Sequence, residues 1–281
     1  YLENIIKDFK LSVTALNTYL ECPYKFKLNN LLKVPKAKQP YLSFGTAVHT
    51  ALEKFHSKLK QDHKTPKKSF LIKQFKESLR QEILTPQELD TRLDHGEKVL
   101  SAYYELHHEK FSPAYFVERY FGGFKSQVFL DDIQLSGKID RIDLIDNNSK
   151  NVRLVDYKTG KRKTRGQIKG TTKNSQGDLK RQLVFYKLLV DLDNSLNVHA
   201  KTTQLDFVEA PHRENKEGRE DFSITNQEVD ELKKIIKQAI KQIRDLNFPR
   251  TDNKSICSRC DFKDHCWPKG IPQLNSDIKT T

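Results

Sequence analysis

The hydrophobic pattern of the chain changes its period near residue 111. Before that point apolar residues recur every three or four positions, as in Val48, Leu52 and Phe55, a spacing that places side chains on one face of an α-helix. After it, short runs rich in Val, Ile, Phe and Tyr follow one another, which is typical of β-strands. The pattern therefore predicts a helical N-terminal layer followed by a core that contains a sheet.

Helices are predicted at four places in the first part of the chain, residues 11–32, 44–60, 70–84 and 86–110. Strands are predicted at residues 115–124, 127–130, 134–146, 152–157 and 201–209, and two more helices at residues 178–193 and 226–247. This order indicates an α/β fold in a single domain over residues 1–281. We expect a mainly helical layer at residues 11–110, a core at residues 111–248 and a C-terminal tail at residues 249–268.

The charge of the chain favours a polyanionic partner. The formal net charge is +13, from 50 Lys and Arg against 37 Asp and Glu. Nucleic acid is the first candidate and an anionic membrane surface the second, although a generally lysine-rich surface gives the same excess. No apolar leader or membrane-length apolar run is present, so we expect a cytoplasmic protein without a membrane partner. Because the chain begins at Tyr1 and has no methionine, we expect it to be a domain of a longer polypeptide.

The four cysteines are unevenly placed, with Cys22 near the start and Cys257, Cys260 and Cys266 near the end. One site that used all four would bring the two ends of the chain together. Disulfides belong to oxidising compartments and suit small secreted domains, unlike this long, lysine-rich chain. Zinc sites made only of cysteines are usually built from two close pairs, whereas an iron–sulfur cluster tolerates a split of one and three. Thiol chemistry thus favours a cluster and leaves zinc open.

Two predicted strands carry carboxylates that suit a divalent cation. Asp156 and Lys158 are separated by one residue at the end of a strand, so they point to the same face. A carboxylate that holds a cation, beside a lysine that steadies phosphate charge, suits phosphodiester hydrolysis, although such a pair alone is most often a solvated surface pair. Asp140 on the preceding strand supplies a second carboxylate for Mg²⁺ or Mn²⁺. Asp143 has the opposite parity and is expected to be structural, with pairing to Arg141 open.

Further polar residues could complete such a site. His49 lies one helical turn after Gly45 and could join the metal shell, although a histidine there is more often part of the core. Gln182 and Tyr186 share one face of a predicted helix, where they could contact nucleic acid or form ordinary helix surface. The loop after Lys158 has no acid as far as Gly177 and suits a nucleic-acid backbone or a solvated loop; its basic residues include Lys161, Arg162, Lys163 and Arg165.

Taken together, these residues resemble the RecB-like branch of the PD-(D/E)XK nuclease superfamily. The shared motifs occur in the order Gly45…His49, Gly137–Asp143, Asp156–Gly160 and Gln182…Tyr186. The cysteine arrangement is similar to that of the iron–sulfur subgroup of this branch, which includes AddB nuclease domains, CRISPR adaptation nucleases and nuclease domains of UvrD-like helicases. It combines Cys22-Pro23-Tyr24 in front with Cys-x2-Cys-x5-Cys behind, and the resemblance extends over residues 11–268.

The resemblance implies a restriction-endonuclease-like core, in which helices flank a central mixed sheet. It implies that Asp140, Asp156 and His49 bind Mg²⁺ or Mn²⁺ and that Lys158 is the catalytic lysine. The four cysteines, Cys22, Cys257, Cys260 and Cys266, would hold a 4Fe–4S cluster that closes the tail onto the front of the chain. Glu118 is a candidate outer carboxylate. Site support or contact with DNA would come from Gln182, Tyr186, Arg141, Lys161, Arg162, Lys163 and Arg165.

The resemblance therefore predicts a metal-dependent DNA nuclease, most simply an exonuclease on single-stranded DNA ends within a helicase–nuclease repair or recombination protein. The alternatives are a stand-alone or CRISPR adaptation nuclease and, in another class, a catalytically silent module that clamps DNA for a partner helicase. The cluster is expected to be structural. It would hold the layer that contains His49 against the strands that carry Asp140, Asp156 and Lys158.

Overall fold

The computed structural model describes residues 1–36, 39–124, 126–146, 148–173, 175–214 and 216–271. Asn174 of the predicted basic loop and residues 272–281 of the predicted domain lie outside these ranges. The chain divides into two compact units. The sheet unit consists of residues 10–13 and 38–235, and the terminal unit consists of residues 1–9, 14–37 and 236–281. The terminal unit thus contains both ends of the chain, and the large sheet belongs to the other unit.

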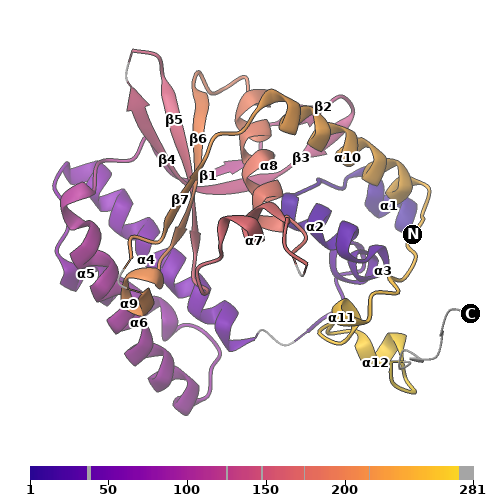
Figure 1. Ribbon diagram of the computed structural model, residues 1–281, viewed down its shortest axis with the longest axis horizontal. Coiled ribbons are helices and arrows are strands. Elements are labelled where there is room, and N and C mark those ends of the chain that lie inside the picture. The colour runs from indigo at the N-terminus through magenta and orange to yellow at the C-terminus, as the bar shows by residue number, and fades with distance from the viewer. Residues whose placement is uncertain (37–38, 125, 147, 174, 215, 272–281) are drawn as a thin grey trace, which may run out of the picture. The chain divides into compact units, whose positions relative to one another are not determined.

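A mixed five-stranded sheet, in the order β1-β4-β5-β6-β7, forms the centre of the sheet unit (Figure 1). Its strands are β1 (Phe116–Phe121), β4 (Gly137–Asp146), β5 (Asn151–Lys158), β6 (His199–Phe207) and β7 (Arg219–Phe222). Only β5 and β6 are parallel among these neighbouring strands, and the crossover between them contains α7 (Arg165–Lys169) and α8 (Asp178–Leu192). A separate small hairpin consists of β2 (Val128–Leu130) and β3 (Ile133–Leu135).

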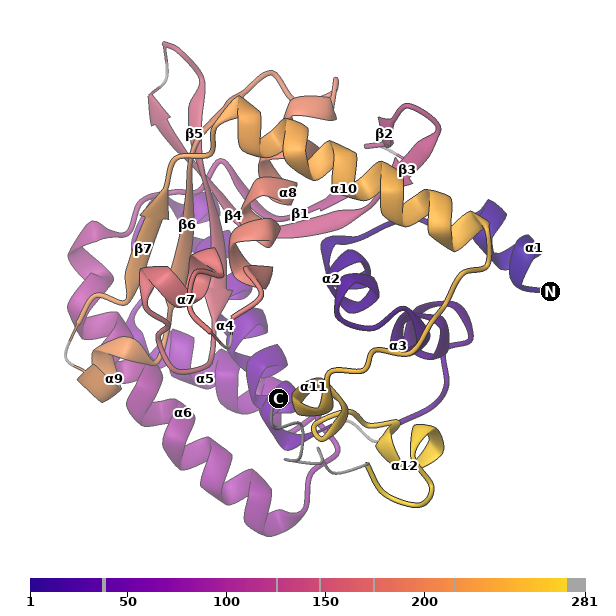
Figure 2. The same ribbon diagram turned by 45° about the vertical axis from the view of Figure 1, so that its right-hand side comes forward.

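Three helices cover one face of the sheet (Figure 2): α4 (Pro40–Asp62), α5 (Lys68–Leu79) and α6 (Pro86–His107). The apolar stripe of α4, which includes Val48, Leu52 and Phe55, is fully buried in one core with Val155 and Tyr157 of β5. Full burial of such side chains stabilises a fold by roughly 1.5–3 kcal/mol each. This core therefore fixes α4, and the residues that α4 carries, against β5.

The start of helix α6 and its packing against α5 follow from a capping box, a proline and a glycine in its sequence. Thr85 and Glu88 form a capping box that satisfies free amide groups of the first turn, and Pro86 occupies a position where no amide hydrogen is needed. Gly96 allows α5 to approach, because a Cβ atom there would lie 2.1 Å from Cζ of Phe75. Short helices η2 (His108–Lys110) and α9 (Ala210–Glu214) lie in the connections that follow α6 and β6.

Helix α8 covers the opposite face of the sheet, together with α7 (Figure 2). Leu183 of α8 and Ile168 of α7 pack on Leu205 and Phe207 of β6. Both faces of the sheet are therefore covered, which explains why most of β5 and the second half of β6 are buried. Gly137 of β4 allows a close approach here, because a Cβ atom would lie 2.6 Å from a terminal carbon of Leu189.

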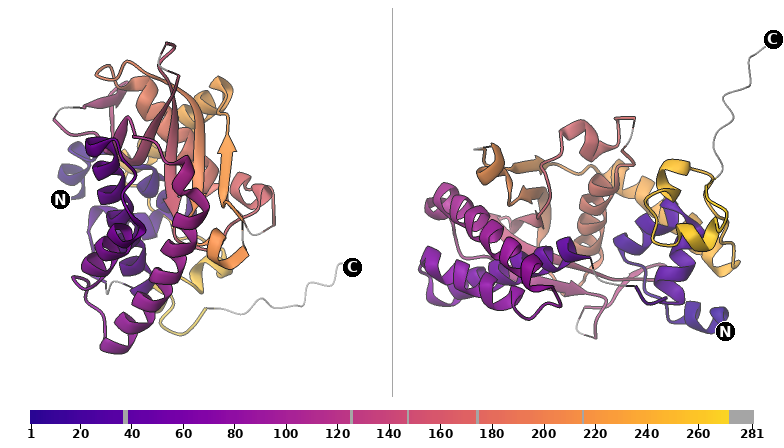
Figure 3. Two further views of the ribbon diagram at one scale, coloured as in Figure 1. Left: turned by 90° about the vertical axis from the view of Figure 1, so that its left-hand side faces the viewer. Right: turned by 90° about the horizontal axis from the view of Figure 1, so that it is seen from below.

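The terminal unit brings the start of the chain against its final segment (Figure 3). The Tyr19 hydroxyl donates to the carbonyl of Asn247 at 3.2 Å, and the Tyr24 amide donates to that of Pro249 at 3.2 Å. The rings of Phe26 and Phe248 stack. The helices here are α1 (Leu2–Lys7), α2 (Val13–Glu21), α3 (Pro23–Phe26), η1 (Lys27–Leu31), α11 (Lys254–Cys257), α12 (Lys263–Cys266) and the end of α10 (Asn226–Arg244).

The structure confirms the predicted fold class, a mixed sheet flanked by helices, and α4, α5 and α6 lie where the sequence places helices. A continuous helix over residues 11–32 is wrong. Helix α2 ends at Glu21, Cys22 is extended with φ −160°, and α3 starts at Pro23 because proline is tolerated only in a first helical turn. Strand β7 and helix α7 were not predicted. None of the helices in the described part of the chain has the length and apolarity that a membrane span requires.

Candidate active site and cysteine site

Asp140 lies in the middle of β4 and is 5 % exposed. Its Oδ2 accepts a 2.8 Å hydrogen bond from the amide of Tyr157, which links it to the strand that carries Asp156. Its Oδ1 is 3.3 Å from Nδ1 of His49 on α4. Helix α4 can approach the end of β5 because residue 45 is glycine. A Cβ atom there would lie 3.1 Å from Oγ1 of Thr159, the residue that follows β5. The structure thus brings His49 and Asp140 together.

Glu118 joins this pair from β1. Ligand atoms of His49, Glu118 and Asp140 all lie within 4.8 Å of one another. Glu118 has φ +50°, in the left-handed region that residues other than glycine rarely adopt. Strained backbone of this kind is concentrated at functional sites, where surrounding structure holds it in place. The sequence indicated Glu118 only as an outer carboxylate, because its position opposite Asp140 depends on the register of β1 and β4.

Asp156 is 3 % exposed and is held by two residues of α8. Its Oδ1 accepts hydrogen bonds from Nε2 of Gln182 at 2.9 Å and from the hydroxyl of Tyr186 at 2.9 Å. The Lys158 ammonium donates to Oε1 of Gln182 at 2.8 Å and lies 2.7 Å from Oδ2 of Asp156. Asp156 therefore contacts residues of α8 through Oδ1 and the Lys158 ammonium through Oδ2.

The two carboxylates differ in proton affinity. Burial alone would raise the pKa of Asp140, but the hydrogen bond and charge of His49 and the amide of Tyr157 outweigh it, and the pKa is lowered. Burial raises the pKa of Asp156, the charge of Asp140 adds to this, and Lys158 only partly opposes it. Burial would lower the pKa of His49, but its hydrogen bond to Asp140 outweighs burial and the pKa is raised. Asp140 is thus the more readily ionised of the two aspartates.

These residues fit a divalent cation. Mg²⁺ and Mn²⁺ prefer carboxylate oxygens, and an imidazole nitrogen suits Mn²⁺ as well. The buried carboxylate of Asp156 and the cluster of His49, Glu118 and Asp140 supply such donors. A cation would also favour the ionised form of both buried aspartates.

Arg141 lies on the α4 side of the sheet and is 6 % exposed. Its guanidinium donates to both oxygens of Asp143 at 2.8 and 3.0 Å, and also to the hydroxyl of Tyr157. It lies 3.0 Å from Nε2 of His56. The contacts of Arg141 in this structure are therefore with residues of the sheet and of α4.

The basic residues after β5 fall into two groups. Arg162 and Arg165 both contact the buried Glu220 of β7, and Arg165 also lies over the ring of Phe222. Lys161 and Lys163 are exposed. The arginines therefore anchor the loop to β7, although Arg165 stays half exposed, and both lysines face solvent.

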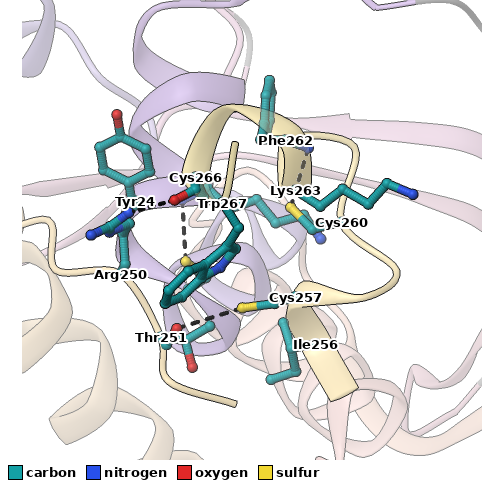
Figure 4. A pocket seen from close by; sticks show the side chains of 12 residues that line it. Tyr24, Arg250, Thr251, Ile256, Cys257, Cys260, Phe262, Lys263, Cys266 and Trp267 are labelled. Atoms are coloured by element: carbon teal, nitrogen blue, oxygen red, sulfur yellow. Dashed lines mark hydrogen bonds between the residues drawn. The ribbon is translucent and has the colours of Figure 1, made fainter. Parts of the chain in front are cut away.

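The four cysteines line one partly open pocket in the terminal unit. Figure 4 shows Cys257, Cys260 and Cys266 around it with the indole of Trp267. The amide of Lys25 donates to Sγ of Cys22 at 3.4 Å, and the amide of Phe262 donates to Sγ of Cys260 at 3.5 Å. All four are free thiols.

These thiols fit a metal cluster better than they fit a pair of disulfides. Burial raises the pKa of Cys266, and the charges of Cys260, Cys22 and Cys257 raise it further, while Arg250 lowers it. Four thiolates that repel one another in one cavity gain from a shared cationic centre, and amide groups directed at sulfur stabilise such thiolates. The donor set therefore fits an iron–sulfur cluster or a zinc ion.

The fold and these residues define a nuclease of a known class. The sequence pattern of the PD-(D/E)XK nuclease superfamily matches residues 10–267, and the chain belongs to this superfamily. It is also similar to one subunit of the ATP-dependent helicase/deoxyribonuclease of Carboxydothermus hydrogenoformans, with 29 % identity over 188 residues. That alignment covers 53 % of this chain and 16 % of the relative, so the chain spans a small part of the relative's length. The similarity is consistent with the RecB-like branch.

Proposed function

We propose that this chain is a metal-dependent DNA nuclease that hydrolyses phosphodiester bonds at single-stranded DNA ends as an exonuclease. The observation that carries the proposal is the convergence of side chains from α4, β4 and β5. His49 lies 3.3 Å from Asp140, which accepts a hydrogen bond from the amide of Tyr157, the residue after Asp156. Lys158 lies 2.7 Å from Oδ2 of Asp156. Membership of the PD-(D/E)XK superfamily supports hydrolysis of nucleic acid. The net charge of +13 supports a polyanionic substrate.

Each side chain has a definable role in this proposal. Asp140, Asp156 and His49 would hold Mg²⁺ or Mn²⁺, with Glu118 as a fourth donor, and the cation would supply Lewis acidity toward the phosphate. The Lys158 ammonium, fixed by Gln182, would stabilise negative charge that develops on the phosphate oxygens. Gln182 and Tyr186 are positioning residues, because they contact Asp156 and not the reacting atoms.

We also propose that Cys22, Cys257, Cys260 and Cys266 hold a 4Fe–4S cluster with a structural role. The terminal unit is small and contains Cys22 together with cysteines more than 200 positions later in the chain, so a covalent link between them would stabilise it. The similar helicase/deoxyribonuclease supports a place for this chain as the nuclease domain, over residues 1–281, of a helicase–nuclease repair or recombination protein. A helicase in the same chain or complex is then the expected partner.

The experiment that tests the enzyme is degradation of end-labelled single-stranded DNA with Mn²⁺ by cluster-loaded protein kept under anaerobic conditions. We expect activity in the wild type and its loss in Asp156→Asn and Lys158→Ala. Asp191→Asn is the matched control, because Asp191 is likewise an aspartate paired with a lysine, here Lys187 one helical turn away on α8, at 2.8 Å. Circular single-stranded DNA should stay intact if the enzyme needs an end. A wild type that binds DNA and cleaves neither substrate would identify a silent clamp instead.

A further inference from the structure

An exposed tyrosine stands on β1 next to the candidate metal site. Tyr120 is 53 % exposed, whereas its neighbour Phe121 is fully buried. Tyr120 pairs directly with Lys138 of β4, so their side chains leave the same face of the sheet. Lys138 forms an ion pair with Glu118, which belongs to the candidate metal cluster. Tyr120 and Lys138 therefore lie on the face that carries the metal donors.

The separation between this tyrosine and the metal donors is short. Glu118 and Tyr120 are two residues apart on β1, so their Cα atoms are at most about 7 Å apart even for a fully extended backbone. Arg119 between them points the other way, because its guanidinium lies 3.3 Å from Asp193 and 3.1 Å from the hydroxyl of Ser195. A DNA strand with a phosphate at the metal donors would thus carry its next nucleotide past Tyr120.

The ring of Tyr120 is supported from one side. A Cβ atom on Gly123 would lie 3.1 Å from the ring, so the ring rests over the backbone of the turn that follows β1. The amide of Gly122 donates to the carbonyl of Ser126 at 2.6 Å and holds this turn closed. Because the ring rests against this turn while the residue stays 53 % exposed, a planar partner could stack on it without a large loss of side-chain freedom.

The surroundings of this ring combine aromatic and cationic groups. Phe124 in the same turn is 95 % exposed. The Lys10 ammonium donates to the carbonyl of Gly122 at 2.8 Å, and Lys138 lies opposite Tyr120. Proteins that bind single-stranded nucleic acid combine stacking rings with cations that follow the backbone. Neither the pairing of β1 with β4 nor the binding of a metal ion requires the exposed ring of Tyr120.

We propose that Tyr120 stacks on a base of a single-stranded substrate, next to the nucleotide whose phosphate lies at the metal donors, and that Lys138 contacts the backbone there. This inference rests on the proposed nuclease function and extends it to the recognition of the strand. An ammonium has three donors, so Lys138 can contact a phosphate while it keeps Glu118. A base within a duplex has both faces covered by its neighbours, so stacking on Tyr120 would select unpaired DNA.

The test measures binding and cleavage with the full, cluster-loaded chain. Dissociation constants are measured by fluorescence anisotropy in the Asp156→Asn background, on a labelled single strand and on a series that carries one abasic nucleotide at successive positions from the end. Tyr120→Ala should weaken binding of the intact strand by roughly 5- to 150-fold, as expected for one lost base–aromatic stack. Tyr120→Phe should bind within about twofold of the parent, because stacking needs the ring and not the hydroxyl.

The abasic series separates stacking from a general loss of affinity. One abasic position should weaken binding to the parent protein and leave binding to Tyr120→Ala unchanged, because the ring and the base form one interaction. Tyr115→Ala is the matched control, since Tyr115 is also an exposed tyrosine and lies at the other end of β1, where its amide donates to Ile142. Equal melting temperatures would exclude misfolding as the cause of any change.

The outcomes distinguish this inference from the proposed function. Unchanged DNA binding by Tyr120→Ala, in a protein whose wild type cleaves DNA, overturns the inference and leaves the nuclease intact. Loss of helicase binding with unchanged DNA binding would also overturn it and would identify Tyr120 as a protein contact. Suppose that an abasic position weakens binding to the parent protein but not to Tyr120→Ala, and that the wild type cleaves no DNA. That result would support stacking and refute the nuclease. An absence of DNA binding would refute both.

Discussion

Removal of the Tyr186 hydroxyl is the smallest change that tests how Asp156 is held. In Tyr186→Phe, Oδ1 of Asp156 loses one of its two hydrogen-bond donors and keeps Nε2 of Gln182. The ring stays buried, so packing of α8 against the sheet is preserved. The hydroxyl stabilises the ionised form of Asp156, and its loss should therefore raise the pKa of that carboxyl above its already raised value.

The magnitude follows from the kind of bond that is lost. A hydrogen bond to a charged group contributes about 1.5–3 kcal/mol, and loss of a residue that orients a metal ligand typically costs about 10- to 100-fold in metal affinity or activity. We expect the Mn²⁺ concentration for half-maximal cleavage to rise about 10-fold or more in Tyr186→Phe. The acid limb of the pH profile should move to higher pH, because Asp156 must lose its proton before it binds the cation.

The assay is the initial rate of cleavage of end-labelled single-stranded DNA, measured across Mn²⁺ concentration and pH. Tyr104→Phe is the matched control, since the Tyr104 hydroxyl donates to the carbonyl of Pro66, away from the candidate site. A merely structural role for Tyr186 would lower the melting temperature without moving the metal midpoint. An unchanged metal midpoint and an unchanged acid limb in a folded Tyr186→Phe protein would refute the proposed role.

Three further predictions concern stability. Gly96→Ala should lower the melting temperature, because overpacking against Phe75 costs about 1–3 kcal/mol. This cost outweighs the gain of about 0.5–1 kcal/mol in helix propensity. A higher melting temperature would contradict this prediction. Burial lowers the pKa of His107 to about 4, so the unfolded chain takes up a proton first as the pH falls. The free energy of unfolding should decrease between about pH 6.5 and pH 4 by on the order of 1–3 kcal/mol, and urea unfolding of His107→Gln should show a shallower decrease. Cys266→Ser should abolish the broad visible absorbance of a cluster and expose residues 14–36 to hydrogen exchange, whereas removal of Mn²⁺ by a chelator should change neither.

The parts of the candidate site that depend on local spacing could be predicted from the sequence. Asp156 and Lys158 share a face because side chains of a strand alternate, and they lie 2.7 Å apart at their charged atoms. Gln182 and Tyr186 share a face because they are one helical turn apart, and both reach Asp156. Their attachment to Asp156 could not be derived in this way, because it depends on the crossover that places α8 over β5 and β6.

The contacts that depend on register or on distant partners were not foreseeable. Glu118 meets Asp140 only because β1 and β4 pair in one register, and its left-handed backbone has no signal in the sequence. Arg162 and Arg165 lie in a run of basic residues that suggests nucleic acid, yet both contact Glu220, which is distant in the sequence. A run of basic residues in a sequence does not show which of them form ion pairs in the folded protein.

The candidate metal site and the cysteine site belong to different units, which changes the role expected for the cysteines. His49 is fixed within the sheet unit, because α4 is buried in one core with Val155 and Tyr157 of β5 and because His49 itself contacts Asp140. Cys22 groups instead with the C-terminal segment in the terminal unit. A cluster is therefore not needed to hold His49 against the strands. Its loss should first unfold the segments it links, and a protein without it should keep hydrogen-exchange protection in α4 while losing it around Cys22.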